Sequence, residues 1–289
     1  MKFQGVYTAL VTPFRNGQID TDALNRLVDE QVAAGVAGIV PVGTTGESPT
    51  LTYEEHEQVI RMVVARAQGK CQIIAGTGAN CTREAIEMTK RAKDDGADAT
   101  LQVTPYYNKP TQEGIYRHFS TVAEKTGLPV VLYNVPGRAG VPIATETIAR
   151  LSKNPLMVAV KEAGGSVDRV SEILDQCDIT VLSGDDSLTL PMISVGAKGI
   201  ISVASNLIPG ELSAMVEAAL NGDFASARAA HRKYYPLFRN LFIESNPIPV
   251  KAAMGMTGAI TPEYRLPLCE ISAAHAEVLK KTLVDCGIL

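Results

Sequence analysis

Residues 156–160, Leu156-Met157-Val158-Ala159-Val160, form a short apolar run that leads directly into Lys161 and Glu162. The run does not alternate between apolar and polar residues, so it predicts a strand over Met157–Val160 that is buried on both faces of a sheet. Seven further apolar runs predict strands near Val6–Val11, Gly38–Val42, Gln72–Ala75, Ala99–Val103, Val130–Tyr133, Thr180–Leu182 and Gly199–Val203. Strands of this kind are typical of a parallel sheet covered by helices.

Amphipathic segments separate these strands and predict helices. Examples are Asp22–Ala33, Tyr53–Ala67, Arg83–Lys93 and Val167–Gln176. Eight strand-then-helix units, spaced by roughly 20–35 residues, favour a (β/α)8 TIM barrel, an α/β fold, over an open doubly wound sheet.

Glycines recur where a helix gives way to the next strand. Gly35, Gly96 and Gly196 each stand between a helical pattern and a predicted strand. Glycine at such a position can take the left-handed conformation that ends a helix and turns the chain into the next strand.

The strand signal stops after about Leu220, and the rest of the chain has only helical patterns. These patterns cover Phe224–Ile243, Pro249–Met256 and Ile271–Val284. We therefore expect two parts: a catalytic (β/α)8 barrel over residues 1–222 and a three-helix C-terminal extension over residues 223–289 that packs against it.

Composition excludes several classes of protein. The chain has 27 Lys and Arg against 31 Asp and Glu, a net charge of −4, so a basic nucleic-acid-binding surface is not expected. Five cysteines without a C-x-x-C pair, and no signal peptide or long apolar segment, favour a cytoplasmic protein with no membrane contact. The four histidines lack metal-ligand spacing, and neither a Walker A nor a dinucleotide-binding motif is present, so no metal or cofactor is expected.

Lys161 is the most distinctive candidate for catalysis. In a barrel of this kind the active site lies at the carboxyl ends of the strands. Strand alternation predicts that Met157, Ala159 and Lys161 share one face. If that face is the barrel interior, poor solvation favours the neutral amine, which is the nucleophilic form of a lysine. The alternative is a strand-end lysine that reaches water or pairs with Glu162.

Other strand ends carry polar residues that allow two interpretations each. Tyr133 has a phenol that can relay a proton, but it can equally be a core tyrosine. Thr44 and Thr45 lie in a glycine-bounded loop that can hold a carboxylate or can be an ordinary turn. Arg138 can bind a carboxylate bidentately or lie on the surface. These residues taken singly leave the alternatives open.

Taken together, the motifs resemble a known family. The chain is similar to the pyruvate-dependent class I aldolases, which include N-acetylneuraminate lyase, at Gly43-Thr44-Thr45-Gly46-Glu47, Tyr133-Asn134-Val135-Pro136 and Val160-Lys161-Glu162. Within that superfamily it resembles the dihydrodipicolinate synthase family at Pro105-Tyr106-Tyr107-Asn108-Lys109-Pro110, Asn134-Val135-Pro136-Gly137-Arg138 and Ser183-Gly184-Asp185-Asp186. The similarity extends from Gly5 to the segment Asn246–Lys251.

The resemblance implies a lyase of lysine and diaminopimelate biosynthesis. Such an enzyme condenses pyruvate with L-aspartate-4-semialdehyde to give 4-hydroxy-tetrahydrodipicolinate. Lys161 would form a Schiff base with pyruvate, and the protonated imine would itself be the electron sink, so no cofactor is implied. The implied proton relay is Tyr133, Thr44 and Tyr107, with Tyr107 donated by the neighbouring subunit. The implied substrate-binding groups are Thr45, Arg138, Gly184 and the backbone carbonyl of Ile201.

The resemblance also implies an assembly and a regulator. Because Tyr107 would complete a neighbour's site, it implies a homotetramer built from two tight dimers. It further implies feedback inhibition by L-lysine at a separate site made of Ser48, His56, Asn80, Glu84 and Tyr106. Thr52 and Glu55 predict a capping box, so a helix should begin at about Tyr53 and place Tyr53 and His56 on one face.

Two rival functions are compatible with part of these motifs. Another pyruvate aldolase, such as N-acetylneuraminate lyase or a keto-deoxy-sugar-acid aldolase, shares the lysine and the tyrosine, so Lys161 and Tyr133 do not discriminate. Arg138 and the Tyr106-Tyr107 pair favour the amino-acid enzyme. A barrel that only binds or regulates is disfavoured because the full set of polar residues is present.

Overall fold

The computed structural model describes residues 2–289, and eight parallel strands within that range close into a barrel. The strands are β1 (Gly5–Ala9), β4 (Gly38–Val40), β5 (Gln72–Gly76), β6 (Ala99–Val103), β7 (Val130–Asn134), β8 (Met157–Glu162), β9 (Thr180–Ser183) and β10 (Gly199–Ser202). Neighbouring barrel strands follow one another along the chain, and β10 closes the barrel against β1. The predicted (β/α)8 barrel is confirmed.

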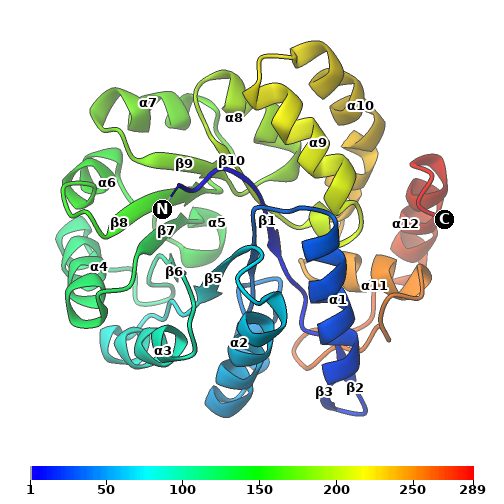
Figure 1. The fold of residues 1–289 in the computed structure, drawn as a ribbon, viewed down its shortest axis with the longest axis horizontal. Coiled ribbons are helices and arrows are strands. Elements are labelled where there is room, and N and C mark those ends of the chain that lie inside the picture. Colours follow the sequence, from blue (N-terminus) through cyan, green and yellow to red (C-terminus); the bar gives the residue numbers. More distant parts are fainter. Residues whose placement is uncertain (1) are drawn as a thin grey trace.

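Helices surround the strands, as Figure 1 shows. The surrounding helices are α1 (Thr21–Ala33), α2 (Tyr53–Ala67), α3 (Thr82–Asp94), α4 (Gln112–Thr126), α6 (Thr145–Leu151), α7 (Asp168–Gln176), α8 (Thr189–Ser194) and α9 (Pro209–Leu220). A short helix, α5 (Pro136–Ala139), follows β7, and single 3₁₀ turns are η1 (Ser48–Thr50), η2 (Asp186–Leu188) and η3 (Ala204–Asn206). The apolar faces of the helices and the outward side chains of the strands form the larger core.

A second, smaller core fills the barrel interior. Val131 and Tyr133 of β7, Ala159 of β8 and Leu182 of β9 belong to it, so alternate residues of each strand point inward. Met157 does not share that face, contrary to the prediction, and packs in the outer core. The reason is a register shift between β7 and β8 at Val130 and Val131, which moves Met157 out of the alternation.

The three glycines predicted to end helices do so in the left-handed conformation. The φ angles of Gly35, Gly96 and Gly196 are 72°, 96° and 118°. Each glycine directly follows the C-cap residue of its helix. A residue with a side chain would be strained at such a φ angle, and glycine is not.

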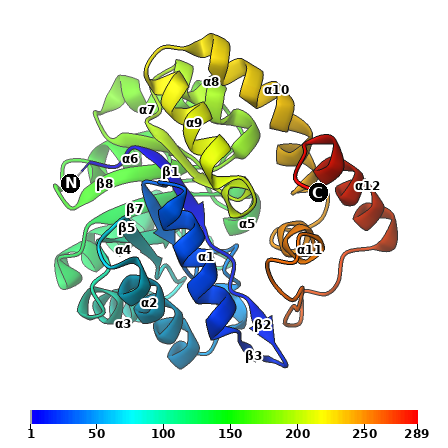
Figure 2. The same ribbon diagram turned by 45° about the vertical axis from the view of Figure 1, so that its right-hand side comes forward.

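The chain ends in three helices, α10 (Phe224–Asn240), α11 (Ile248–Met256) and α12 (Ala273–Asp285). Figure 2 shows α11 and α12 beside the barrel. The first of the three, α10, packs against α9 of the barrel. The helix α12 begins at Ala273 rather than at the predicted Ile271, because the Ser272 hydroxyl accepts a hydrogen bond from the N–H of His275 and caps the helix.

A small hairpin after β1 was not predicted. The strands β2 (Phe14–Arg15) and β3 (Gln18–Ile19) are each two residues long, too short for a periodic pattern. The turn between them, Asn16-Gly17, has φ angles of 53° and 77°, and Asn-Gly is a common sequence signal for this type of tight turn. Figures 1 and 2 both place the hairpin next to the segment that links α11 to α12.

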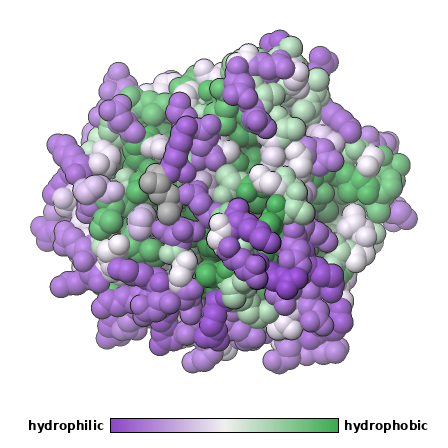
Figure 3. All heavy atoms as spheres, in the orientation of Figure 1, coloured by the Kyte–Doolittle hydropathy of each residue, from purple (hydrophilic) through white to green (hydrophobic). Residues whose placement is uncertain are grey.

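The surface is largely hydrophilic, as Figure 3 shows, with apolar atoms gathered at the edge over α12. Val278, Val284 and Leu289 are exposed there. Throughout residues 2–289 there is no helix with the length and apolar character needed to span a membrane.

Candidate active site

Lys161 lies near the carboxyl end of β8 and points into the barrel. It is in register with Tyr133 on β7 and with Leu182 on β9, and only 7% of its surface is exposed. Its Nζ lies 4.2 Å from the centre of the Tyr133 ring. Among residues 2–289, no carboxylate forms an ion pair with this ammonium. Lys161 is therefore a buried lysine whose nitrogen meets an aromatic face.

Glu162, the next residue, lies on the opposite face of the strand. Its fully buried carboxylate accepts hydrogen bonds from Asn134 Nδ2 at 2.8 and 3.0 Å, from the Gly164 N–H at 2.7 Å and from Arg169 Nε at 2.9 Å. The alternative in which Glu162 pairs with Lys161 is therefore wrong. Because Asn134 ends β7, the same carboxylate also ties together the ends of the two strands that carry Tyr133 and Lys161.

Gly184 provides the space that the Lys161 side chain occupies. A Cβ at this position would lie 3.0 Å from Lys161 Cε and 2.7 Å from the Cβ of Ala163. The Gly184 N–H donates a hydrogen bond to the Glu162 carbonyl at 2.8 Å, and this bond opposes a shift of the Gly184 backbone away from Lys161. Glycine is required here because the backbone approaches the lysine closely.

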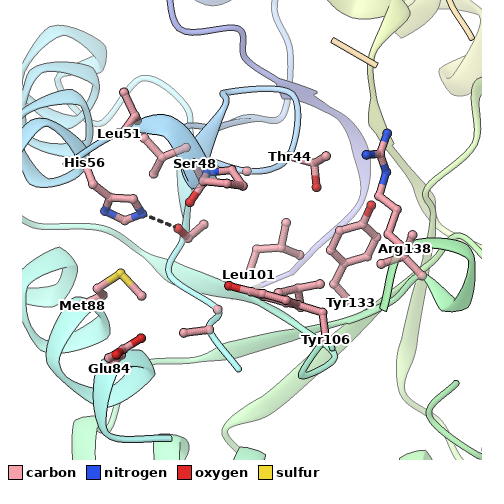
Figure 4. A pocket seen from close by; sticks show the side chains of 18 of the residues that line it. Thr44, Ser48, Leu51, His56, Glu84, Met88, Leu101, Tyr106, Tyr133 and Arg138 are labelled. Atoms are coloured by element: carbon pink, nitrogen blue, oxygen red, sulfur yellow. Dashed lines mark hydrogen bonds between the residues drawn. The ribbon is translucent and has the colours of Figure 1, made fainter. Parts of the chain in front are cut away.

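A cavity of about 410 Å³ opens over the face of Tyr133. Thr44, Tyr133 and Arg138 line one end of it. In Figure 4 the Thr44 hydroxyl and the Tyr133 phenol point into the same space, with the Arg138 guanidinium nearby. Three of the predicted site residues are thus brought together from the loop after β4, from β7 and from α5.

Asn246, which precedes α11, supports this end of the cavity. Its carbonyl accepts a hydrogen bond from Arg138 Nη2 at 3.2 Å, and its Nδ2 donates to Thr45 Oγ1 at 3.0 Å. Thr45 is buried and lies outside the cavity lining, as does Ile201, which packs in the barrel interior with Tyr133. The C-terminal part of the chain therefore reaches the groups around Tyr133.

Four of the five residues implied for lysine binding line the other end of the same cavity. They are Ser48, His56, Glu84 and Tyr106. Burial lowers the pKa of His56, and Nε2 of its neutral ring donates to the Gly76 carbonyl at 2.8 Å. Burial raises the pKa of Tyr106, and the nearby Glu84 carboxylate raises it further. This end therefore presents the carboxyl group of Glu84 and a phenol, Tyr106, that stays protonated.

The helix that carries His56 begins as predicted. The Thr52 hydroxyl accepts from the Glu55 N–H at 3.2 Å, and the Glu55 carboxylate accepts from the Thr52 N–H at 2.9 Å. This capping box starts α2 at Tyr53.

Asn80 and Tyr107 lie outside the cavity lining. Asn80 Nδ2 donates to the Tyr106 carbonyl at 3.2 Å, so it fixes the loop after β6. Tyr107 is 90% exposed, and its φ of 71° is left-handed. Its side chain is therefore open to the surroundings rather than packed in its own chain.

Comparison with known proteins decides the family. The model of the dihydrodipicolinate synthetase family matches residues 2–285. The chain belongs to this family.

Relatives within the dihydrodipicolinate synthetase family are similar over their full length. A protein of Methanocaldococcus jannaschii named 4-hydroxy-tetrahydrodipicolinate synthase is 52% identical over 288 residues, covering 99% of this chain and 100% of the relative. The Acinetobacter baumannii dihydrodipicolinate synthase, solved with pyruvate, superimposes with a TM-score of 0.98 at 46% identity and covers 100% of both chains. The Cyanidioschyzon merolae enzyme, solved with lysine bound, gives 0.96 at 42% identity, covering 99% of both chains.

Membership of the family confirms the function predicted from the sequence. The chain is a lyase with the function of 4-hydroxy-tetrahydrodipicolinate synthase, rather than another pyruvate aldolase.

One feature of this family member, a buried ion pair, was not predicted from the sequence. Lys251 of α11 pairs with Glu47, and both side chains are fully buried. Both residues stand in motifs that carried the resemblance, Gly43–Glu47 and Asn246–Lys251, but no role was inferred for them. The sequence does contain a signal for this ion pair. Lys251 is the single charged residue in the apolar segment Ile248–Met256, and a lysine in such a segment predicts a buried charge that needs a partner.

Proposed function

We propose that Lys161 forms a Schiff base with pyruvate, and that the resulting enamine attacks L-aspartate-4-semialdehyde to give 4-hydroxy-tetrahydrodipicolinate. The observation that carries this proposal is the buried Lys161 nitrogen, which faces the Tyr133 ring without a carboxylate partner among the described residues. The family assignment supports the choice of reaction. An amine that no carboxylate holds in an ion pair is free to approach the keto carbon of a substrate.

The proposed reaction begins and ends at the Lys161 nitrogen. The Lys161 nitrogen attacks the keto carbon of pyruvate, and water leaves. The protonated imine withdraws electrons, so the methyl carbon loses a proton and becomes nucleophilic. That carbon forms a bond to the aldehyde carbon of the second substrate, while the C=O π bond opens and the aldehyde oxygen takes up a proton. The amine of the second substrate then displaces Lys161 as the ring closes.

Protons in these steps are handled by hydroxyl groups around the Tyr133 end of the cavity. We assign Tyr133, Thr44 and the neighbouring subunit's Tyr107 to this relay, and Arg138 to the carboxylate of L-aspartate-4-semialdehyde. Thr44 and Tyr133 pointing into one space supports the relay. The contact of Arg138 with the Asn246 carbonyl keeps its guanidinium at the cavity, where it can bind a carboxylate. Thr45, Gly184 and the Ile201 carbonyl are assigned to holding substrate groups.

A direct assay tests the proposed function. Purified protein with pyruvate and L-aspartate-4-semialdehyde should form product, measured by a coupled reduction of the product. The same protein with N-acetylneuraminate should release no pyruvate. Release of pyruvate from N-acetylneuraminate, with no condensation of the amino-acid substrate, would contradict the proposal.

Gly184→Ala should slow the reaction by on the order of a hundredfold, because a displacement of a reacting group by about 1 Å has an effect of that size. The added Cβ would collide with Lys161 Cε and with Ala163 Cβ. Steady-state kinetics and the rate of borohydride trapping with pyruvate would both measure the loss. Gly210→Ala is the matched control, since its added Cβ meets no atom within 4 Å. Equal rates in the two variants would show that Gly184 does not position Lys161.

We further propose that L-lysine inhibits the enzyme at the far end of the cavity, through Ser48, His56, Asn80, Glu84 and Tyr106. The Glu84 carboxylate suits the ammonium group of the ligand, and the Asn80 amide and the protonated Tyr106 phenol suit its α-carboxylate. The continuous cavity between Tyr133 and Glu84 supports this proposal, and so does the relative solved with lysine bound.

L-Lysine titrated at fixed pyruvate should lower the activity partially, and Glu84→Ala should lose that response, each variant being compared with its own lysine-free rate. The apparent affinity should fall at least tenfold, because a charge-assisted bond is worth about 1.5–3 kcal/mol. Arg83→Ala, on the exposed side of the same helical turn, is the control and should respond like the unaltered enzyme. If the Glu84 variant keeps its full response, the assignment of the site is wrong.

We propose that the enzyme is a homotetramer of two tight dimers in the cytoplasm. The exposure of Tyr107 supports a subunit interface at the loop after β6. All five cysteines are free thiols, which suits a reducing compartment. Within each subunit, we assign catalysis to residues 1–222 and the support of its loops to residues 223–289.

A further inference from the structure

Thr44 lies in a strained loop. Val42 and Glu47, on either side of it, have left-handed φ angles of 49° and 55°. Such angles are unfavourable for residues with a side chain, above all for a β-branched valine, and they persist only when surrounding contacts enforce them. The position of the Thr44 hydroxyl therefore depends on whatever holds the two ends of this loop.

The Glu47 end is held by the C-terminal extension. The Lys251 ammonium pairs with Glu47 Oε1, and both side chains are fully buried. The same ammonium lies 4.3 Å from the centre of the Phe14 ring and 5.4 Å from that of Tyr264. The second oxygen of the Glu47 carboxylate accepts from the backbone N–H of Arg265 at 3.4 Å. Burial lowers the pKa of Lys251, while the Glu47 charge opposes that effect.

Two more residues of the extension, Asn246 and Arg265, bind the same region. Asn246 Nδ2 binds Thr45 Oγ1 at 3.0 Å, immediately beside Thr44. The Arg265 guanidinium binds both oxygens of Glu55 at 2.6 Å and the Thr50 carbonyl at 3.0 Å. The extension therefore contacts the segment from Thr45 to Glu55 at four separate residues: Thr45, Glu47, Thr50 and Glu55.

We propose that Lys251 and Glu47 form a positioning pair, which keeps Glu47 in its left-handed conformation and thereby fixes the Thr44 hydroxyl for proton transfer at Tyr133. A buried ion pair is in general a poor source of stability, because desolvation offsets the attraction. Here the pair orients a residue instead of stabilising the fold. It fixes the Glu47 carboxylate, and thereby the backbone φ angle of Glu47, three residues beyond Thr44. The inference rests on the proposed function and adds to it a role for the C-terminal extension.

The test is a double-mutant cycle between the pair and Thr44. The neutral-pair variant, Glu47→Gln with Lys251→Met, removes both charges and leaves no unpaired buried charge. It should lower kcat about tenfold with little change in the KM for pyruvate, which is within the range of coupling between neighbouring groups. Thr44→Val should lower kcat about a hundredfold. In the Thr44→Val background, adding the neutral pair should lower kcat by less than about a further twofold. The Thr44 hydroxyl, through which the pair acts, is already absent there.

Borohydride trapping adds a readout that a general loss of structure would change. The neutral-pair variant should still trap pyruvate on Lys161, since the pair interacts with Phe14, Tyr264 and Arg265 rather than with Lys161. Glu244→Gln is the control for a loosened extension: Glu244 binds Ser272 and His275 within that extension, and the variant should keep kcat within about twofold.

The outcomes separate the two proposals. A full tenfold further loss in the Thr44→Val background, a loss of trapping in the neutral-pair variant, or an equal loss in Glu244→Gln would each overturn the positioning role. An unchanged kcat in the neutral-pair variant would overturn it as well. If the unaltered enzyme makes no product, the proposed function itself fails.

Discussion

Arginine in place of Lys161 is expected to lower kcat/KM by more than about a thousandfold, the scale seen when a catalytic nucleophile is removed. A guanidinium stays protonated at every pH at which a protein is folded, so it cannot attack the keto carbon of pyruvate. The substitution keeps a long, positively charged side chain beside Tyr133, so the loss would follow from chemistry and not from a missing charge. Steady-state kinetics with pyruvate and L-aspartate-4-semialdehyde measures it.

Lys153→Arg provides the matched control for this prediction. Lys153 is exposed, so the same chemical change should leave kcat/KM within about twofold. Circular dichroism and thermal unfolding of both variants would show whether the barrel is intact. Activity above about a tenth of normal in a folded Lys161→Arg protein would rule out Lys161 as the nucleophile.

Phenylalanine in place of Tyr107 is expected to lower kcat about a hundredfold, the usual contribution of a group that transfers a proton. The phenol would act in the neighbouring subunit, because Tyr107 is 90% exposed on its own chain. Measured alone, this loss does not distinguish action within a subunit from action between subunits. Mixing two inactive variants makes that distinction.

Tyr107→Phe mixed with Lys161→Ala under conditions of subunit exchange should recover activity. A site that takes Lys161 from one chain and Tyr107 from the other is complete, and random exchange leaves roughly a quarter of all sites in that state. Exchange would be followed by native mass spectrometry of the mixture. If mixed oligomers form and activity does not return, the assignment of Tyr107 to the neighbouring site is wrong.

The barrel could be predicted because its signals are local. Each buried strand is a short apolar run, and Gly35, Gly96 and Gly196 mark the helix ends at which the chain turns back. Met157 was misplaced because a register shift between two strands leaves no trace in either strand alone. The β2–β3 hairpin was not predicted because each of its strands is only two residues long. The pair Asn16-Gly17 is a sequence signal for the turn, but it does not indicate strands on its own.

The candidate site was predictable where its residues lie near the carboxyl ends of strands, as Tyr133 and Lys161 do. The contacts that support it were not, because they join distant parts of the chain. Lys251 and Glu47 are 204 positions apart, and Asn246 and Thr45 are 201 apart. Nothing in the local pattern of either segment specifies its partner. The space that Gly184 leaves for Lys161 is likewise a property of two neighbouring strands, β8 and β9, packed together.

Borohydride reduction in the presence of pyruvate tests the central claim most directly. After digestion and mass spectrometry, the reduced pyruvate adduct should lie on the peptide that contains Lys161, and its formation should require pyruvate. Lys251 is the natural competitor, since it is the other buried lysine among residues 2–289, but its ammonium is held by Glu47. An adduct on Lys251 or on any other lysine, or no adduct at all, would contradict the Schiff-base mechanism proposed for this enzyme.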